Sequence, residues 1–305
     1  MALPRRHPSA RSRSVSLHRW FTPWVLVIPA VLWLAIFSLW PAINTFVLSF
    51  SNVRTLTGGQ FVGLRNYLQM LADPQLHDAV FNTVLYMVVC IPLLTFLPLL
   101  LALLVEKQLP FIGFFRTVFY FPVIASAVVV ALIWQWLLDD RGVINGLAQS
   151  IGLVHGAVPF LTDRWLLLFS AIALTVWKGL GYYMIIFLSA LGNVRRDLHE
   201  AAAVDGAGLV RRFWTVTVPG VRATMTLVAV LICVNAMRIF TELYILGGST
   251  GGVGGQDVSI VMLIQGAASG SNGQLGYASA LSVFLFVITV GPMIALARLN
   301  RSADR

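Results

Sequence analysis

Three polar side chains, Asn235, Arg238 and Glu242, stand at spacings of three and four residues inside an otherwise apolar stretch of the chain. On a continuous helix these spacings place the three side chains on one face. Charged groups at membrane depth are costly, and those that occur usually pair with one another or line the path of a polar solute. We therefore expect Arg238 and Glu242 to interact and to line or gate a pathway, with a purely structural ion pair as the open alternative.

Two adjacent tyrosines, Tyr182 and Tyr183, stand in another apolar stretch, which also contains Lys178. A tyrosine ring can stack on a sugar ring, although aromatic side chains in membrane helices more often serve packing. Lys178 has a long apolar stem that lets its ammonium group reach the membrane surface or a partner helix. The two tyrosines are therefore candidate pathway residues beside the polar trio.

The residues needed for catalysis, nucleotide binding or metal binding are not assembled in this sequence. A phosphate-binding loop needs Gly-Lys-Ser or Gly-Lys-Thr, but the two lysines follow Glu106 and Trp177. The five histidines lack ligand spacing, and Cys90 and Cys233 lie in apolar stretches. No nucleophile stands with a base, which argues against an intramembrane enzyme. We expect no catalytic residue, no metal ion and no cofactor on this chain.

The candidate residues must be positioned by membrane helices. The chain has 305 residues, of which 58% are hydrophobic and 11% charged, as is typical of an integral membrane protein. A helix needs about 20 apolar residues to cross a hydrocarbon core of about 30 Å. The predicted fold is all-α, with six transmembrane helices. They are Trp24 to Phe50, Asn82 to Val105, Thr117 to Leu138, Trp165 to Leu191, Met225 to Leu246 and Ala278 to Leu296.

The basic residues predict the orientation of these helices. With the amino terminus inside, 15 of the 21 Lys and Arg residues fall on inner segments, and only Arg54, Arg65, Arg141 and Arg164 fall on outer ones. Both termini are therefore predicted to be cytoplasmic. The net charge of +9 follows from topology and from contact with anionic membrane lipid, so nucleic acid is not an expected partner. The first apolar run is about twice as long as that of a secretory signal and is interpreted as an uncleaved span.

The segment after the fourth predicted span has the pattern of a helical hairpin. Asp197 and Glu200 have the spacing of a capping box, which predicts a short helix that starts there and continues through the alanines. Asp205 and Gly206 interrupt this helix, because glycine permits a tight turn and aspartate can cap a second helix.

The second helix of the hairpin is predicted over Leu209 to Val218 and ends at Pro219. An amphipathic hairpin that anchors to headgroups would account for its arginines and for Trp214. It would not account for the slim, alanine-rich first helix with a glycine break.

The outer segments are predicted to be short connections. Residues 61–67 are expected to form a small helix or turn at the interface. Residues 246–255 contain six glycines but no following lysine, and they fall on the outer side. They are interpreted as a flexible connector rather than a phosphate cradle.

The hairpin resembles a segment of the permease subunits of bacterial ATP-binding-cassette importers of the sugar type, the class of the maltose and glycerol-3-phosphate permeases. The family's pattern is Glu-Ala-Ala, two residues, Asp-Gly-Ala, and then an aromatic residue and a hydrophobic-x-hydrophobic-Pro ending. Further stretches that are similar to this family extend over nearly the whole chain. The hairpin pattern is matched by Glu200, Ala201, Ala202, Asp205, Gly206, Ala207, Phe213, Val216, Val218 and Pro219.

The resemblance implies that the first short helix couples the permease to a cytoplasmic ATPase, by sitting in a cleft of that subunit. The implied partners are a second homologous permease, two ATPase subunits that bind ATP and magnesium, and an extracytoplasmic substrate-binding protein. The implied coupling residues are Glu200, Ala201, Ala202, Asp205, Gly206, Ala207, Phe213 and Pro219.

The resemblance also implies a location in the bacterial inner membrane and a function. The chain would form half of a path, worked by alternating access, for a carbohydrate or a related polyol or glycerophospho-compound. The predicted domains are a basic tail over residues 1–23, a six-helix permease domain over 24–298 with its coupling loop at 191–222, and a second tail over 299–305. A secondary transporter or a channel without an ATPase is the alternative function.

Overall fold

The computed structural model of the protein describes residues 22–106 and 111–301. Within these ranges the regular structure is helical, apart from one isolated bridge between Ser51 and Phe61. The predicted all-α fold is thus confirmed. Residues 1–21 and 302–305 of the two predicted tails lie outside the described part of the chain.

The chain divides into two compact units, residues 1–45 and residues 46–305. The first unit contains α1 (Thr22–Leu34), the π-helix η1 (Ala35–Leu39) and the start of α2 (Trp40–Leu48). The consecutive helices α1, η1 and α2 form one stretch, Trp24–Leu48, that is long and apolar enough to cross a membrane. This is the first predicted span.

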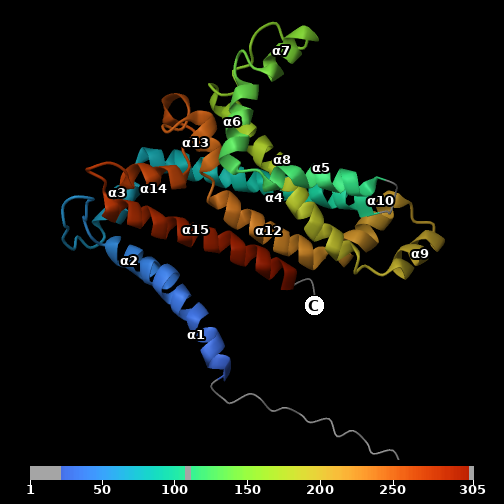
Figure 1. Cartoon of the computed structure of the whole chain (residues 1–305), viewed down its shortest axis with the longest axis horizontal. Coiled ribbons are helices and arrows are strands. Elements are labelled where there is room, and N and C mark those ends of the chain that lie inside the picture. The colour runs from blue at the N-terminus through green and yellow to red at the C-terminus, as the bar shows by residue number, and fades with distance from the viewer. Residues whose placement is uncertain (1–21, 107–110, 302–305) are drawn as a thin grey trace, which may run out of the picture. The chain divides into compact units, whose positions relative to one another are not determined.

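The second unit is a helical bundle in which α4 (Pro74–Glu106), α8 (Arg164–Leu191), α12 (Arg222–Met237) and α15 (Leu275–Arg301) lie side by side (Figure 1). The helix α4 packs along both α8 and α12, and α12 packs on α15. Tyr86, Leu99, Phe187 and Ile232 are among the fully buried side chains of the shared core. The second, fourth and sixth predicted spans correspond to α4, α8 and α15.

The helix α5 (Ile112–Ile124) lies directly against α8. A Cβ atom added at Gly181 of α8 would stand 2.1 Å from the carbonyl oxygen of Phe119 in α5. Since real Cβ atoms do not approach backbone so closely, a glycine is required at this crossing. The two helix backbones therefore meet without an intervening side chain.

The third predicted span, Thr117 to Leu138, is not one helix. The chain leaves helical geometry at Ala125 and Ser126, whose ψ angles are 143° and 133°. The helix α6 (Ala127–Leu138) then continues toward α7 (Val143–Ser150), and this second part makes an angle of 98° with α5. Contacts explain the turn, because α6 packs on α13 (Thr241–Gly247) and Gln135 donates a hydrogen bond to the carbonyl of Ile245 at 2.8 Å.

The fifth predicted span, Met225 to Leu246, is also interrupted. The helix α12 ends at Met237, and α13 (Thr241–Gly247) begins only after a break at residues 238–240. The break is stabilised from outside the span, because the Ser259 hydroxyl donates to the carbonyl of Ile239 at 2.7 Å. A local pattern of apolar residues could not reveal a hydrogen bond from a residue 20 positions away.

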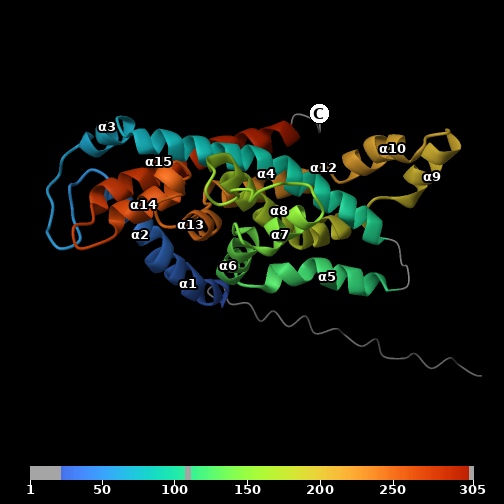
Figure 2. The ribbon, with the colours of Figure 1, turned by 90° about the horizontal axis from the view of Figure 1, so that it is seen from above.

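The connections at one end of the bundle contain more structure than predicted. Residues 61–67 lead into α3 (Arg65–Leu71), as expected, but α14 (Ile260–Ala268) was not anticipated. The glycine-rich segment folds into turns and the short 3₁₀-helix η3 (Val253–Gly255), with positive φ at five of its glycines. The interpretation as a flexible connector was therefore wrong. Figure 2 places α3 and α14 at the opposite end of this unit from α9 (Arg196–Val204) and α10 (Leu209–Arg212).

Candidate functional site

A polar cavity of about 380 Å³ lies among α4, α8 and the break between α12 and α13. Its lining includes all five residues predicted from the sequence to line a pathway. The helix α8 contributes Tyr182 and Tyr183, and the chain around the break contributes Asn235, Arg238 and Glu242. The structure therefore brings together two groups of residues that are separated by about 50 positions in the sequence.

The interruption of the fifth span corrects the predicted geometry of the polar trio. Arg238 is the C-cap residue that directly follows α12, whereas Glu242 lies in the first turn of α13. The two side chains thus do not share one helical face. The ion pairs found over residues 22–106 and 111–301 are Arg164 with Asp78 and Arg195 with Asp197, so the expected pair between Arg238 and Glu242 is not formed.

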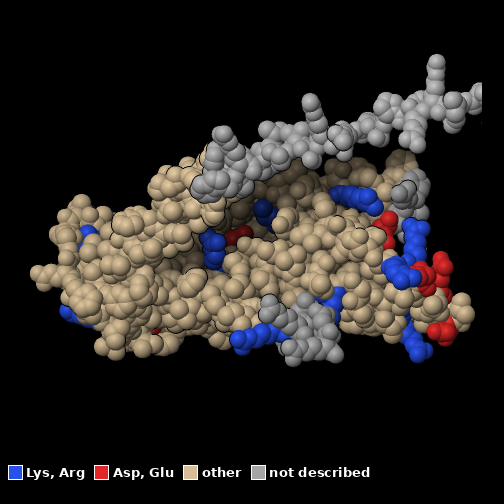
Figure 3. Space-filling model, turned by 90° about the horizontal axis from the view of Figure 1, so that it is seen from below, with Lys and Arg blue, Asp and Glu red and all other residues tan. Residues whose placement is uncertain are grey.

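Three charged side chains, Lys178, Arg238 and Glu242, line the cavity. In the described part of the chain none of them makes a side-chain ion pair. Charged side chains are few in the middle of the largely uncharged surface that Figure 3 shows. Because unpaired charge at membrane depth is costly, these groups favour a cavity that meets water or a polar solute.

The two tyrosines of α8 differ in exposure. The ring of Tyr182 is 45% exposed, whereas Tyr183 is only 5% exposed and belongs to the core. Their ring centroids are 5.1 Å apart and their planes meet at 77°, an edge-on contact. Tyr182 is thus the ring available to a solute, and Tyr183 supports it from within.

Three polar residues of the cavity wall were not predicted from the sequence. They are Tyr86, Thr175 and Thr241. The hydroxyl of Tyr86 in α4 is hydrogen-bonded to that of Thr175 in α8 and contacts the carbonyl of Ala171 at 3.3 Å. The signal that could have indicated Tyr86 and Thr175 is a polar side chain inside an apolar span, the same signal that indicated Arg238.

The predicted hairpin is present at one end of the bundle. It comprises α9 (Arg196–Val204), α10 (Leu209–Arg212), the π-helix η2 (Phe213–Thr217) and α11 (Val218–Gly220). Gly206 makes the turn with a φ of 75°, a left-handed conformation that suits glycine. Acidic and basic side chains gather at this end in Figure 3.

The predicted caps of the hairpin helices were wrong. The helix α9 begins at Arg196 with Arg195 as its N-cap, and Asp197 lies inside the first turn, where it forms an ion pair with Arg195. Asp205 does not cap the second helix, whose N-cap is Gly208. Asp205 is instead the C-cap of α9. Pro219 lies within α11, and the sharp bend of 73° follows at Val221.

The two halves of the hairpin differ in how they contact the bundle. Glu200, Ala201, Asp205 and Gly206 are exposed, whereas Ala202 and Ala207 are partly buried. In the second half Phe213 packs against the core, and Trp214 contacts Phe96 of α4 with ring centroids 6.3 Å apart. The first half of the hairpin is therefore largely exposed, whereas the second half is held against the bundle.

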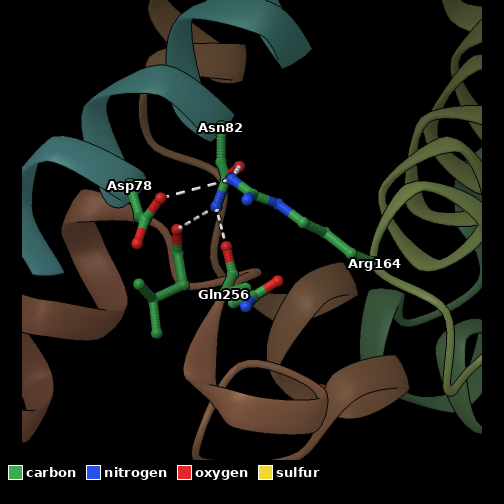
Figure 4. A network of polar contacts seen from close by, with 5 residues as sticks. Asp78, Asn82, Arg164 and Gln256 are labelled. Carbon is green, nitrogen blue, oxygen red and sulfur yellow. Dashed lines mark hydrogen bonds and ion pairs between the residues drawn. The ribbon is translucent and has the colours of Figure 1, made fainter.

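A polar network lies at the opposite end of the bundle (Figure 4). The side-chain amide of Asn82 in α4 donates to the carbonyls of Gln256 and Val258 at 2.6 Å and 3.1 Å. Arg164, the first residue of α8, contacts both Asp78 at 3.3 Å and Asn82 at 3.5 Å. These contacts fasten the connection before α14 to two spans.

Asp257 is enclosed beside this network. The residue is 1% exposed, and its Oδ1 atom has no hydrogen-bond partner among the described residues. Burial raises the pKa of its carboxyl to about 7. The charge of Arg164 opposes that increase, and the carboxylates of Asp163 and Asp78 add to it. Gly252 closes over it, since a Cβ atom there would stand 2.7 Å from Oδ2.

Comparison with known proteins places the chain among transport proteins. Residues 70–305 match the family described as binding-protein-dependent transport system inner membrane component. The chain is 31% identical over 271 residues to the probable ABC transporter permease protein YurN of Bacillus subtilis, covering 88% of this chain and 92% of that protein. It is 29% identical over 281 residues to the lactose transport system permease protein LacF of Rhizobium radiobacter, covering 91% and 93%.

A solved structure has the same fold. It is that of a bacterial alginate ABC transporter in complex with an alginate pentasaccharide-bound periplasmic protein. The TM-score is 0.77 at 23% identity, over 94% of this chain and 96% of that chain.

Proposed function

The chain belongs to the family of binding-protein-dependent transport system inner membrane components, and from this premise we propose that it forms half of a carbohydrate pathway worked by alternating access. It is a multi-pass inner membrane protein and a permease subunit of an ATP-binding-cassette importer. The proposed cargo is a carbohydrate or a related polyol or glycerophospho-compound. The lactose permease and the alginate transporter support this class of cargo.

The observation that carries the proposal is the polar cavity at the helix break. A sugar offers hydroxyl groups for hydrogen bonds and an apolar ring face for stacking. The cavity offers the exposed ring of Tyr182, the amide of Asn235, and the unpaired charges of Lys178, Arg238 and Glu242. Irregular backbone at membrane depth occurs where it is buried in protein or lines such a cavity.

The partners follow from the hairpin and from the family. We propose a second homologous permease, which would complete the path beside this one, and two cytoplasmic ATPase subunits that bind ATP and magnesium. The exposed first half of the hairpin is suited to a cleft of an ATPase, because alanines permit a close backbone approach. Its Glu200 can accept a charge-assisted hydrogen bond. An extracytoplasmic binding protein agrees with the family description, and this chain binds no cofactor in this arrangement.

Copurification distinguishes this function from a secondary transporter or a channel. The tagged protein is extracted from its native membrane in a mild detergent, and the proteins that accompany it are identified. We expect a subunit with a Gly-Lys-Ser/Thr phosphate-binding loop, together with ATP hydrolysis that the binding protein stimulates. Substrate uptake that continues without any ATPase subunit would overturn the proposal.

The cavity itself is tested by uptake into membranes with matched permease levels. Because Arg238 and Glu242 do not pair, Arg238→Gln and Glu242→Gln should each reduce uptake, and the double variant should not recover it. Tyr182→Ala should reduce uptake, whereas Trp136→Ala, which changes an exposed ring of α6 outside the cavity, should not. Recovery in the double variant would show that the two charges act as a pair.

A further inference from the structure

A second cavity lies beside the hairpin and is not part of the proposed sugar path. It is a groove of about 530 Å³ lined by α4, α11, α12 and one residue of α15. Its wall is mainly apolar and includes Ile91, Phe96, Met225 and Leu296. The one charged side chain among its lining residues is Arg222.

Arg222 has no acceptor within the described part of the protein. Its side chain is exposed and makes neither an ion pair nor a hydrogen bond with residues 22–106 or 111–301. It is the first residue of α12, a helix of 16 residues whose amino terminus carries partial positive charge. The site thus combines two sources of positive potential, and no acidic side chain of the described residues pairs with Arg222.

The groove is placed at the level of lipid headgroups by two observations. Trp214 is 54% exposed and contacts Phe96, a lining residue, with ring centroids 6.3 Å apart. Tryptophan is enriched at the boundary between hydrocarbon and water. Arg222 also falls on the segment with excess basic residues, the side on which anionic lipids supply negative charge.

The wall of the groove also contains an unsatisfied polar group. Thr95 is 4% exposed, and its hydroxyl has no hydrogen-bond partner among the described residues. A buried hydroxyl without a partner is costly. An ester carbonyl at the base of a headgroup is the kind of acceptor that would satisfy it.

We propose that this groove binds an anionic glycerophospholipid, with its phosphate on Arg222 and an acyl chain along the apolar wall. The lipid would brace the junction between α11 and α12, where the chain bends by 73°. A helix of the second permease would supply apolar surface but would leave Arg222 without an anion. The lipid therefore accounts for both the wall and the charge.

Native mass spectrometry of the full-length protein, with the subunits that copurify, tests this site. The probes are phosphatidylglycerol and phosphatidylcholine with identical acyl chains. We expect the wild type to retain phosphatidylglycerol in preference to phosphatidylcholine. Arg222→Gln should lower phosphatidylglycerol retention about tenfold, the size expected for one charge-assisted hydrogen bond.

Arg211→Gln is the matched control, because it removes an exposed arginine of the adjacent hairpin that does not line the groove. It should leave retention unchanged. Thr226→Trp, which fills the groove, should lower retention of both lipids while the protein still copurifies with its partners. Equal losses in Arg222→Gln and Arg211→Gln would indicate diffuse surface attraction and overturn the proposal. Cross-linking of Met225→Cys to a second permease in place of lipid binding would overturn it as well.

Discussion

At the scale of single residues, two places in the structure hold polar or charged groups that other side chains do not neutralise. Lys178, Arg238 and Glu242 meet in the cavity without pairing, and Asp257 is enclosed with one oxygen unsatisfied. Such groups reduce stability unless a ligand, water or a proton compensates them. For the cavity we infer a polar solute, and for Asp257 the compensation is a proton.

The raised pKa of Asp257, about 7 against an ordinary 3.8, predicts a pH-dependent stability. The folded state holds its proton more tightly than the unfolded state does. The stability associated with this proton is therefore complete below pH 3.8 and is lost as the pH rises through 7. The thermal midpoint of the purified protein should fall between pH 5.5 and 8.5 more in the wild type than in Asp257→Asn.

The groups that face this carboxyl, Arg164, Asp163 and Asp78, remain in place in that variant. Asp140→Asn, which changes an exposed carboxylate in another connection, is the control and should keep the wild-type pH dependence. Identical pH profiles for the wild type and Asp257→Asn would contradict the assignment.

At the scale of elements, the hairpin consists of a free first half on an anchored second half. Phe213 and Trp214 hold the base against the core and α4, while α9 is exposed. The ends of the hairpin meet, since a Cβ atom at Gly220 would stand 3.0 Å from the side chain of Val194. Force on α9 would thus be delivered to α8 and α12, the helices that carry the cavity residues.

Two glycines of the hairpin provide a matched test of this role. Gly206 has a φ of 75° and Gly208 a φ of −67°, and both have open space around the Cβ position. Gly206→Ala should strain the turn by about 1 to 2 kcal/mol, whereas Gly208→Ala should be tolerated. Gly206→Pro should distort the turn further, because proline requires a φ near −65°.

Ala202→Trp tests the surface of α9 directly, because the large ring would overfill a cleft that fits a slim helix. We expect Ala202→Trp and Gly206→Pro to lose ATPase copurification and uptake at matched permease levels, and Gly208→Ala to keep both. Normal ATPase binding and uptake in the first two variants would show that the hairpin is only an interfacial anchor.

At the scale of the whole molecule, the second unit has two ends of different character. One end carries the hairpin with its basic residues, and the other carries α3, α14 and the network of Asn82 (Figures 2 and 4). The predicted orientation would place the hairpin in the cytoplasm and the other end on the outer side.

The predicted topology can be measured with site-specific labels. A reporter fused after Arg305 should be cytoplasmic, and single cysteines at Gly58 and Ser249 should react with an impermeant thiol reagent from outside. Gly58 has open space at the Cβ position and Ser249 is exposed. The native Cys90 and Cys233 are buried, so background labelling should be low. An externally accessible carboxyl terminus would contradict the predicted orientation.

The sequence by itself determined the fold class, four continuous spans, the hairpin and the family. Each of these depends on information that is local in the chain, such as a long apolar run, an alanine-rich helix or a glycine at a tight turn. Gly206 is an example, since its neighbours alone indicate the break. The choice of Tyr182 and Arg238 as pathway candidates was likewise local, because polar groups are conspicuous in apolar runs.

Only the tertiary structure decided where two spans break and which polar groups meet. The interruption at Arg238 depends on Ser259, which reaches back to Ile239, and the bend before α6 accompanies a contact between Gln135 and α13. Such interactions join residues far apart in sequence, and hydropathy averaged along the chain cannot register them. Because of the break after α12, Arg238 and Glu242 do not lie on one helical face. They are two separate charges on the cavity wall and do not form the expected ion pair.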